Sequence, residues 1–293
     1  MTRFIEARRH VGVELVCQTL GVGVSTHYDR LKHQPSEREQ RDALLVLQIM
    51  DARSGFKWVY GARKTWKQLK RDGVHDVGRD RVARVMRKKG WKGVTRGKNP
   101  RTTIPGDAPG DRAEDLLDRN FTATRPNEKW VADFTYVRTW QGFVYMAFVL
   151  DIYSRKIVGW QIATHMRTDL VMDALNMAHG LRQPPDGVIA HNDRGTQYTS
   201  IAYTDRLHEL GMQPSVGSRG DAYDNAMAET FVGTYKTELV AGQRFKSFEI
   251  AEHRTAEWLG FYNSERLHEM LCDIPPVEYE MIYELNQAMA TLA

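Results

Sequence analysis

The stretch WVADFTYV at residues 130–137 alternates aromatic and aliphatic side chains as a strand would, and FVYMAFVLD follows at 143–151. Both compositions favour β-strands, and the short link Gln141-Gly142 predicts that the two runs pair as a hairpin. A third strand-like run, residues 157–162, follows after another short connection. The sequence therefore predicts three adjacent antiparallel strands.

A fourth strand is expected at residues 187–191, and a helical pattern over residues 168–181 separates it from the third. A strand that is reached by a helical crossover usually lies parallel to its neighbour in the sheet. The fourth strand should therefore lie parallel to the first and beside it. Asp133, inside the first strand, and Asp193, just past the end of the fourth, should then meet at one edge of the sheet.

The rest of the back half predicts further helices and one short strand: a helix at about 200–210, a strand at 212–216, a helix at about 222–239, and helices over 248–263 and 282–289. The period of 3.6 residues places Asn225, Glu229 and Lys236 on one stripe of the 222–239 helix. In sequence, 35 residues separate Asp193 from Glu229. Two acids and a lysine are therefore gathered in this segment.

Charge divides the chain into two halves. Residues 1–125 hold 27 Lys+Arg against 15 Asp+Glu, whereas residues 126–293 hold 14 against 22. This asymmetry suggests a module that binds a polyanion, joined to a part that collects carboxylates. The alternative is a basic surface that is only solvated.

Cys17 and Cys272 form no disulfide framework and no metal-binding spacing, which favours a reducing cytoplasm.

The first nine residues lack the apolar core of a signal peptide. No apolar run approaches the roughly 18 residues that a membrane span requires. A soluble cytoplasmic protein without membrane contact is therefore expected.

Residues 11–33 predict two short helices around a turn at Gly21, with Ser25 capping the second helix. This is the outline of a helix-turn-helix. Its second helix would present Thr26, His27, Arg30 and Lys32 to DNA. A helical hairpin that serves only packing is the alternative.

The next helical pattern, residues 37–52, places Leu44, Leu47 and Met50 on one apolar side. Helices over residues 62–71 and 79–89 then form a second, more basic helix-turn-helix-like unit. Its basic side chains would neutralise DNA phosphates and give salt-sensitive binding. The predicted contacts are Arg63, Lys64, Lys67, Lys70, Arg81, Arg84, Arg87 and Lys88.

Periodicity is lost from about Val94 to Glu128, where turn-forming residues accumulate. The expected organisation is a helix-turn-helix-like segment at 1–35, a basic helix-turn-helix domain at 36–97, a linker at 98–126, a sheet-containing core at 127–245 and a helical extension at 246–293.

Asp133 lies among aromatic residues, and it needs a partner because burying an unpaired charge is costly. Asp151, at the end of an apolar strand, is interpreted as structural, and Asp221 and Asp224 as caps of the following helix. Spacing alone leaves open whether Asp133, Asp193 and Glu229 hold a metal, because three unrelated acids would give a similar count by chance.

Four ordered motifs add a resemblance: Trp130-x-x-Asp133-Phe134-Thr135-Tyr136, Asp151-x-x-Ser154-Arg155-Lys156-Ile157-Val158-Gly159-Trp160, His191-x-Asp193-Arg194-Gly195-x-Gln197-Tyr198, and Gly220-x-x-x-Asp224-Asn225-Ala226-x-x-Glu229. Together they resemble the DDE transposase/integrase core, and within it the second-frame protein (OrfB) of a large bacterial insertion-sequence family. Similar motifs extend through residues 60–64, 81–87, 262–268 and 275–276. Two departures, Asn192 where Ser is usual and Leu271-Cys272 where Leu-Gly is common, do not touch the acids.

The resemblance implies an α/β catalytic core of ribonuclease H-like fold, a mixed five-stranded sheet with flanking helices, preceded by an all-α helix-turn-helix region. It implies that Asp133, Asp193 and Glu229 hold two Mg²⁺ or Mn²⁺ ions, which serve first hydrolysis and then strand transfer. Lys236 would hold terminal DNA and Asn225 would orient Glu229. His191 would either touch the metal site or pack at its strand end.

The partners implied are double-stranded DNA, both terminal repeats and target, further copies of the chain on that DNA, and a first-frame protein or frameshift fusion. The expected location is the nucleoid of a bacterial cytoplasm. Two alternatives remain open. One is a repressor-like protein that binds the repeats without chemistry, which loss of one acid would have favoured. The other is a nuclease that only hydrolyses.

Overall fold

One five-stranded sheet forms the centre of the described part of the chain, which is residues 1–32, 34–97, 116–117, 120–193, 198, 200–216 and 226–292 of a computed structural model. The strand order is β3-β2-β1-β4-β5. The strands are β1 Lys129–Thr139, β2 Gly142–Asp151, β3 Ile157–Ala163, β4 Ile189–Asn192 and β5 Gln213–Val216. The mixed five-stranded sheet that the sequence predicted is confirmed.

The pairing of the strands decides where the acids lie. β1 pairs antiparallel with β2, and β2 pairs antiparallel with β3, as the hairpin pattern predicted. β4 pairs parallel with β1, and the last pair of that ladder is Ala132 with Asn192. Asp133 follows this pair in β1 and Asp193 follows it at the end of β4, so the predicted meeting of the two acids is confirmed, at the point where the β1–β4 ladder ends.

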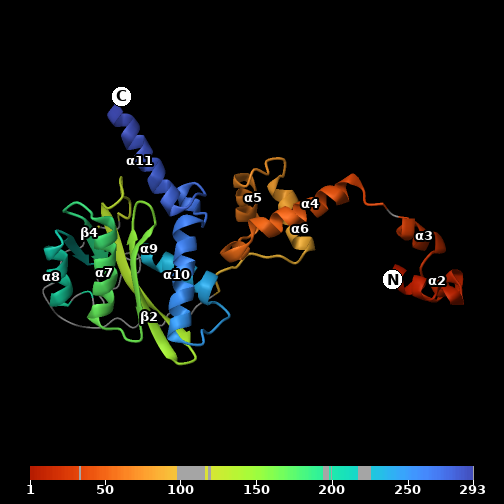
Figure 1. Ribbon diagram of the computed structural model, residues 1–293, viewed down its shortest axis with the longest axis horizontal. Coiled ribbons are helices and arrows are strands. Elements are labelled where there is room, and N and C mark those ends of the chain that lie inside the picture. The colour runs from red at the N-terminus through yellow and green to blue at the C-terminus, as the bar shows by residue number, and fades with distance from the viewer. Residues whose placement is uncertain are drawn as a thin grey trace.

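Two layers of helices cover the sheet (Figure 1). Helices α7 (Thr168–Arg182) and α8 (Ile201–Glu209) pack on one face, and α9 (Ala226–Tyr235) and α10 (Phe248–Ser264) pack on the other. Gly159 of β3 allows α7 to approach closely, because a Cβ atom there would lie 2.2 Å from the Ala174 carbonyl oxygen.

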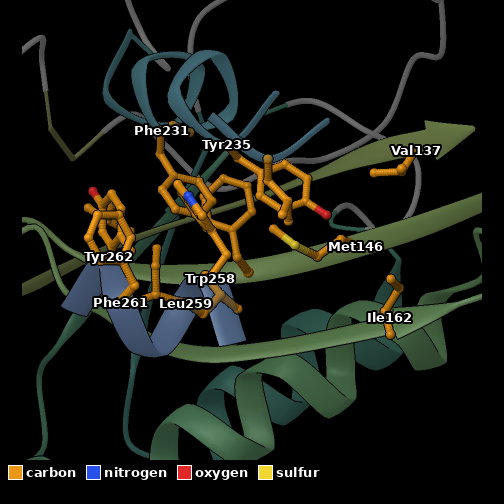
Figure 2. Close-up of a cluster of buried hydrophobic side chains, with 14 of the residues drawn as sticks. Val137, Met146, Ile162, Phe231, Tyr235, Trp258, Leu259, Phe261 and Tyr262 are labelled. Atoms are coloured by element: carbon orange, nitrogen blue, oxygen red, sulfur yellow. The ribbon is translucent and has the colours of Figure 1, made fainter. Parts of the chain in front are cut away.

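Aromatic side chains fix α9 against α10 and the sheet (Figure 2). Phe231 of α9 lies edge-on to Tyr262 of α10, with ring centroids 5.1 Å apart. The Tyr235 hydroxyl lies 2.8 Å from the Thr255 hydroxyl. After Tyr235 the chain forms a π-helical turn, Lys236–Val240, where the sequence predicted a continuous α-helix. The helix that carries Glu229 is therefore held by a buried aromatic cluster.

Helix α11 (Pro276–Leu292) projects away from the sheet and is longer than the predicted 282–289 (Figure 1). Buried Glu280 anchors it, because its carboxylate accepts hydrogen bonds from Arg182, Lys156 and Ser154. Asp151 is fully buried nearby and accepts hydrogen bonds from the Ser154 and Asn127 amides. The structural role expected of Asp151 agrees with these contacts.

The turn before α11 contains one departure from the family pattern, at Cys272. Cys272 has φ 59° and Asp273 has φ 62°, which is the left-handed conformation that glycine adopts most easily. A Leu-Gly pair at 271–272 would place glycine at the first of these two positions. Cys272 therefore occupies a backbone conformation that is unfavourable for its side chain.

Six α-helices lie in the described chain before the sheet: α1 Thr2–Ala7, α2 Val13–Thr19, α3 Val24–Lys32, α4 Glu37–Ala52, α5 Ala62–Arg71 and α6 Arg79–Lys88. Gly21 has the positive φ expected of the turn between α2 and α3. α3 begins at Val24, so the prediction that Ser25 caps it was wrong. His27 is fully buried, with Nε2 3.0 Å from Glu6 Oε1. The prediction that His27 is presented to DNA was therefore wrong.

The buried side of α4 is not the predicted one. Leu45 and Ile49 are buried, whereas Leu44, Leu47 and Met50 are 58%, 63% and 55% exposed. Apolar residues occur around most of this helix, so its period did not identify the face that packs. The buried side is the one that joins Val82 and Val85 of α6 in a small core.

A short segment before α5 joins the helical unit to the sheet domain. Val59 and Tyr60 belong to the same buried cluster as α9 and α10. The Leu267 amide donates to the Tyr60 hydroxyl at 2.9 Å, and the Val94 amide donates to the Val59 carbonyl at 3.1 Å. Most of the predicted 98–126 linker, residues 98–115 and 118–119, lies outside the described residues. No helix in the described ranges is long and apolar enough to cross a membrane.

Candidate active site

Asp133 faces the layer formed by α9 and α10. Alternate residues of a strand point to opposite faces, and Val131 and Val137 lie in the α9–α10 cluster, whereas Trp130 lies in the α7–α8 cluster. Asp133 shares the side of Val131. Its Oδ1 accepts a hydrogen bond from the Phe134 amide at 2.7 Å. Strand alternation thus directs this carboxylate toward the helix that carries Glu229.

Three acids interact electrostatically at this edge. Asp193 directly follows β4, and Glu229 is an exposed residue in the first turn of α9. Burial raises the pKa of Asp133 well above its usual range, and the negative charges of Asp193 and Glu229 raise it further. The positive charge of Lys236 opposes this shift. Asp133 therefore lies where two like charges reach it, and a cation there would relieve the repulsion.

The donor chemistry of these acids fits a divalent cation, because carboxylate oxygens are ligands that Mg²⁺ prefers. Within the described ranges, no group of three or more His, Cys, Asp or Glu side chains is close enough together to hold a metal ion. The acids thus gather around Asp133 without forming a closed set of ligands. Their assignment to a metal stays a prediction.

Tyr198 is a residue of this region to which the sequence assigned no role. It is buried, and its ring stacks on Phe134 with centroids 6.2 Å apart. Burial raises its pKa, and the charges of Asp133 and Asp193 add to that shift. Its hydroxyl has no hydrogen-bond partner among the described residues. The signal available was its place at the end of the motif that contains Asp193.

His191 and Lys236 are both placed beside this edge. His191 is buried, its Nδ1 lies 2.9 Å from the Ser215 hydroxyl of β5, and Phe121 packs against its ring. Lys236 Nζ lies 4.6 Å from the centre of the Tyr136 ring. The third supporting residue predicted, Asn225, lies outside the described residues, as do the predicted caps Asp221 and Asp224.

The basic residues of α5 contact the C-terminal segment. Arg63 pairs with Glu269 at 3.1 Å and with Asp273 at 3.2 Å, and Lys67 also pairs with Asp273 at 3.2 Å. Burial lowers the pKa of Lys64 to about 8, and the nearby Arg266 contributes to the shift.

Lys70, a further predicted DNA contact on α5, is exposed and lies within its own helix rather than against the C-terminal segment. Lys70 lies over the Trp66 ring, 4.4 Å from its centre. Three of the four predicted DNA contacts on α5 thus lie against, or are buried near, the rest of the protein.

The basic residues of α6 divide into two pairs. Arg81 and Arg84 are both partly buried and bind Asp42 of α4, at 3.1 and 2.8 Å. Arg87 and Lys88, at the end of α6, are exposed. Asp42 thus orients the first pair, and DNA contact by all four stays a prediction.

A mixed sheet with acids on β1, after β4 and on α9, preceded by a basic helical unit, defines an integrase-type core joined to a helix-turn-helix-like domain. Family models agree with this assignment. The integrase core domain matches residues 123–222 and, as a second model, residues 210–276. The HTH-like domain matches residues 39–99.

The chain belongs to the insertion-sequence transposases, enzymes with an integrase-type core. It is 47% identical over 268 residues to the "Putative transposase for insertion sequence element IS986/IS6110" of Mycobacterium tuberculosis (strain CDC 1551 / Oshkosh), covering 89% of this chain and 96% of that one. It is 45% identical over 281 residues to the "Transposase for insertion sequence element IS629" of Shigella sonnei, covering 94% of both.

A solved structure of the HTLV-2 integrase catalytic core domain in complex with magnesium aligns with 54% of this chain and 99% of that one. The TM-score is 0.42 and the sequence identity is 12%, a similarity too low to inform the site.

Proposed function

We propose that this transposase binds the terminal inverted repeats of its insertion sequence, cleaves one strand to free a 3′ hydroxyl, and joins that hydroxyl to a second phosphodiester. The observation that supports this most is the end of the β1–β4 ladder, one residue before both Asp133 and Asp193. Glu229 adds its charge to the same point, because it helps to raise the pKa of Asp133.

Asp133, Asp193 and Glu229 are the proposed ligands of two Mg²⁺ or Mn²⁺ ions. Two bound ions of this kind activate an attacking oxygen and stabilise the leaving one. The protein supplies the fixed positions of the carboxylates, since two of them are set by backbone pairing. Lys236, whose charge reaches Asp133, is proposed to hold the terminal phosphate, and Asn225 to orient Glu229. His191 would support the same edge from β4.

The proposal includes the organisation of the protein and its partners. Residues 36–97 are proposed to bind DNA through a separate basic unit, with the core at 127–245 and a helical extension at 246–293. Residues 1–35 are a second helix-turn-helix-like segment, and 98–126 link the halves. Target DNA, further copies of the chain and a first-frame protein or fusion complete the proposed assembly on the bacterial nucleoid.

The decisive experiment compares the wild type with Asp193→Asn on labelled DNA that carries the ends of the element, with Mg²⁺ present. Loss of a metal ligand removes several kcal/mol of transition-state stabilisation, which corresponds to a fall of about a thousandfold in rate. Asp173→Asn is the matched control, because Asp173 is exposed on α7 on the other face of the sheet. Equal nicking and joining by the wild type and Asp193→Asn would contradict the proposal.

A second readout does not depend on activity. Without metal, Asp193→Asn removes a charge that repels Asp133, so the variant should melt at the same temperature as the wild type or higher. Added Mg²⁺ or Mn²⁺ should raise the melting temperature of the wild type more than that of Asp193→Asn. Nicked products without joined products would favour a nuclease that only hydrolyses, and bound but uncut DNA would favour a repressor-like protein.

A further inference from the structure

The α5 face that looks most suited to DNA is already occupied within the protein. Arg63 and Lys67 pair with Asp273, and Arg71 pairs with Glu278 of α11. Just before the helix, Lys57 pairs with Glu265 at 2.9 Å. Each of these cations meets an acid from the segment that runs from the end of α10 to the start of α11. Positive charge on α5 thus serves to join the helical unit to the core.

A different surface of the same unit gathers arginines. An open cavity of about 440 Å³ lies between α4 and α6 and is lined by Arg38, Arg41, Asp80, Arg81 and Arg84. We call this cavity the α4–α6 groove. The lining holds four arginines and one acid, Asp80, whose carboxylate also pairs with Arg79 at 3.1 Å. The groove therefore has an excess of positive charge.

Asp42 fixes two of these arginines. Its carboxylate accepts hydrogen bonds from Arg81 Nε at 3.1 Å and from Arg84 Nη2 at 2.9 Å. Burial opposes ionisation of Asp42, but these hydrogen bonds outweigh it and lower its pKa. A guanidinium group carries five N–H donors, so each arginine keeps further donors for a ligand. Asp42 therefore holds both side chains in place without using up their capacity to bind.

Arg38 and Arg41 supply the other wall of the groove. Both are exposed residues of the first turns of α4. Arg41 contacts Glu37, one turn earlier in the same helix: its Nε donates to the Glu37 carbonyl at 3.3 Å, and its Nη2 lies 3.9 Å from the exposed Glu37 carboxylate. Among the described residues, neither arginine is held by a buried partner, so both can adjust to a ligand, whereas Asp42 fixes Arg81 and Arg84 in advance.

We propose that the α4–α6 groove, formed by Arg38, Arg41, Arg81 and Arg84, binds backbone phosphates of duplex DNA, and that the basic face of α5 does not. The proposal rests on the DNA-binding function proposed above and identifies the surface that performs it. Planar guanidinium groups bind phosphate oxygens through paired hydrogen bonds, which suits a groove with four of them. Arg38 and Arg41 were not among the contacts that the sequence predicted.

The test measures binding of the full chain to a labelled duplex of mixed sequence by fluorescence anisotropy, over a series of salt concentrations. The variant Arg38→Ala/Arg41→Ala removes two exposed cations without touching the Asp42 pairs. The slope of log K against log salt is negative, and each lost phosphate contact makes it less steep by about 0.9. We expect the magnitude of the slope to decrease by about 2 and the affinity to decrease on the order of tenfold or more.

The matched control is Arg63→Ala/Lys67→Ala, which removes the same charge from α5. It should leave the affinity and the salt slope close to those of the wild type, although its melting temperature should fall because Asp273 loses both partners. Arg38→Lys/Arg41→Lys should recover most of the salt slope. Unchanged binding by the α4 variant, or a larger loss of affinity in the α5 variant, would overturn the proposal that DNA binds in the groove.

Failure of the broader function gives a different result. A wild type that binds no duplex at any salt concentration would contradict the proposed DNA-binding function together with the groove. A wild type that binds, with equal binding by Arg38→Ala/Arg41→Ala, would contradict the groove alone.

Discussion

The sheet core and the helical unit of α4, α5 and α6, here called the α4–α6 unit, place their functional side chains by different means. In the core, the backbone ladder between β1 and β4 brings Asp133 and Asp193 to the same edge. In the α4–α6 unit, a small apolar core and the Asp42 carboxylate hold the arginines of the groove. Backbone pairing fixes positions whatever the neighbouring side chains are, whereas the groove depends on individual side chains. The core should therefore be most sensitive to substitutions that displace backbone, and the α4–α6 unit to those that remove side chains.

The largest effect is expected where the core tolerates no side chain at all. Gly159→Ala would place Cβ 2.2 Å from the Ala174 carbonyl and 2.7 Å from Ala178 on α7. Because these atoms belong to a packed helix, the strand and the helix must separate, and we expect a loss of more than about 4 kcal/mol in unfolding free energy. Denaturant unfolding of the purified chain measures it.

Gly180→Ala is the matched control for this substitution. Gly180 lies in α7, the helix that packs against Gly159, at a position where a Cβ meets nothing within 4 Å. Alanine there should stabilise the helix by up to about 1 kcal/mol. Similar stability for Gly159→Ala and Gly180→Ala would show that β3 and α7 are not held rigidly together.

The next largest effect tests which side of α4 is packed. Leu45→Ala removes a buried side chain and should cost about 2–5 kcal/mol, whereas Leu47→Ala, 63% exposed, should change stability by less than about 0.5 kcal/mol. Thermal and urea unfolding of the two variants gives both values. Equal costs would mean that the exposed stripe of α4 is covered by another surface in solution.

These two cases explain what the sequence could and could not predict. A strand has two faces, and β1 shows a clear alternation, so its pairing and the meeting of Asp133 with Asp193 followed from pattern and crossover rules. A helix has a continuous surface, and α4 is apolar around most of it, so its packed side was predicted wrongly. The role of Asp42 was missed because a single acid on an exposed-looking helix carries no local signal of the arginines opposite it.

A smaller effect with a pH signature is expected at Glu280, the side chain that anchors α11. Burial would raise its pKa, but hydrogen bonds from Arg182 and Lys156 outweigh burial and lower the pKa below its usual value of 4.5. Its ionised form therefore stabilises the protein above that value, and the stabilisation is lost as pH falls through the lowered pKa. Glu280→Gln should cost about 2–3 kcal/mol near neutral pH, because it breaks a buried charge pair.

The measurement is the unfolding free energy of the wild type and Glu280→Gln as a function of pH. The difference between them should be constant near neutrality and should shrink once pH falls below 4.5. A difference that persists unchanged in acid would show that packing of the side chain, rather than its charge, holds α11 to the core.

The smallest effect concerns the joint between the two regions. The Tyr60 hydroxyl accepts a hydrogen bond from the Leu267 amide at 2.9 Å and donates a longer one to the Glu265 carbonyl at 3.4 Å, and Tyr60→Phe removes both while keeping the ring buried. Leaving one buried donor unpaired should cost about 1–2 kcal/mol. Because Tyr60 shares a core with α9 and α10, this loss should destabilise both regions together.

Hydrogen exchange of backbone amides in β1 and in α6 separates the possibilities. Equal loss of protection in both elements is the expected outcome, since one shared core makes one cooperative unit. Loss confined to α6 would mean that the α4–α6 unit opens while the sheet stays folded. The groove could then move relative to Asp133 and Asp193, and the division between a backbone-placed site and a side-chain-placed site would also be a division between a fixed part and a movable part.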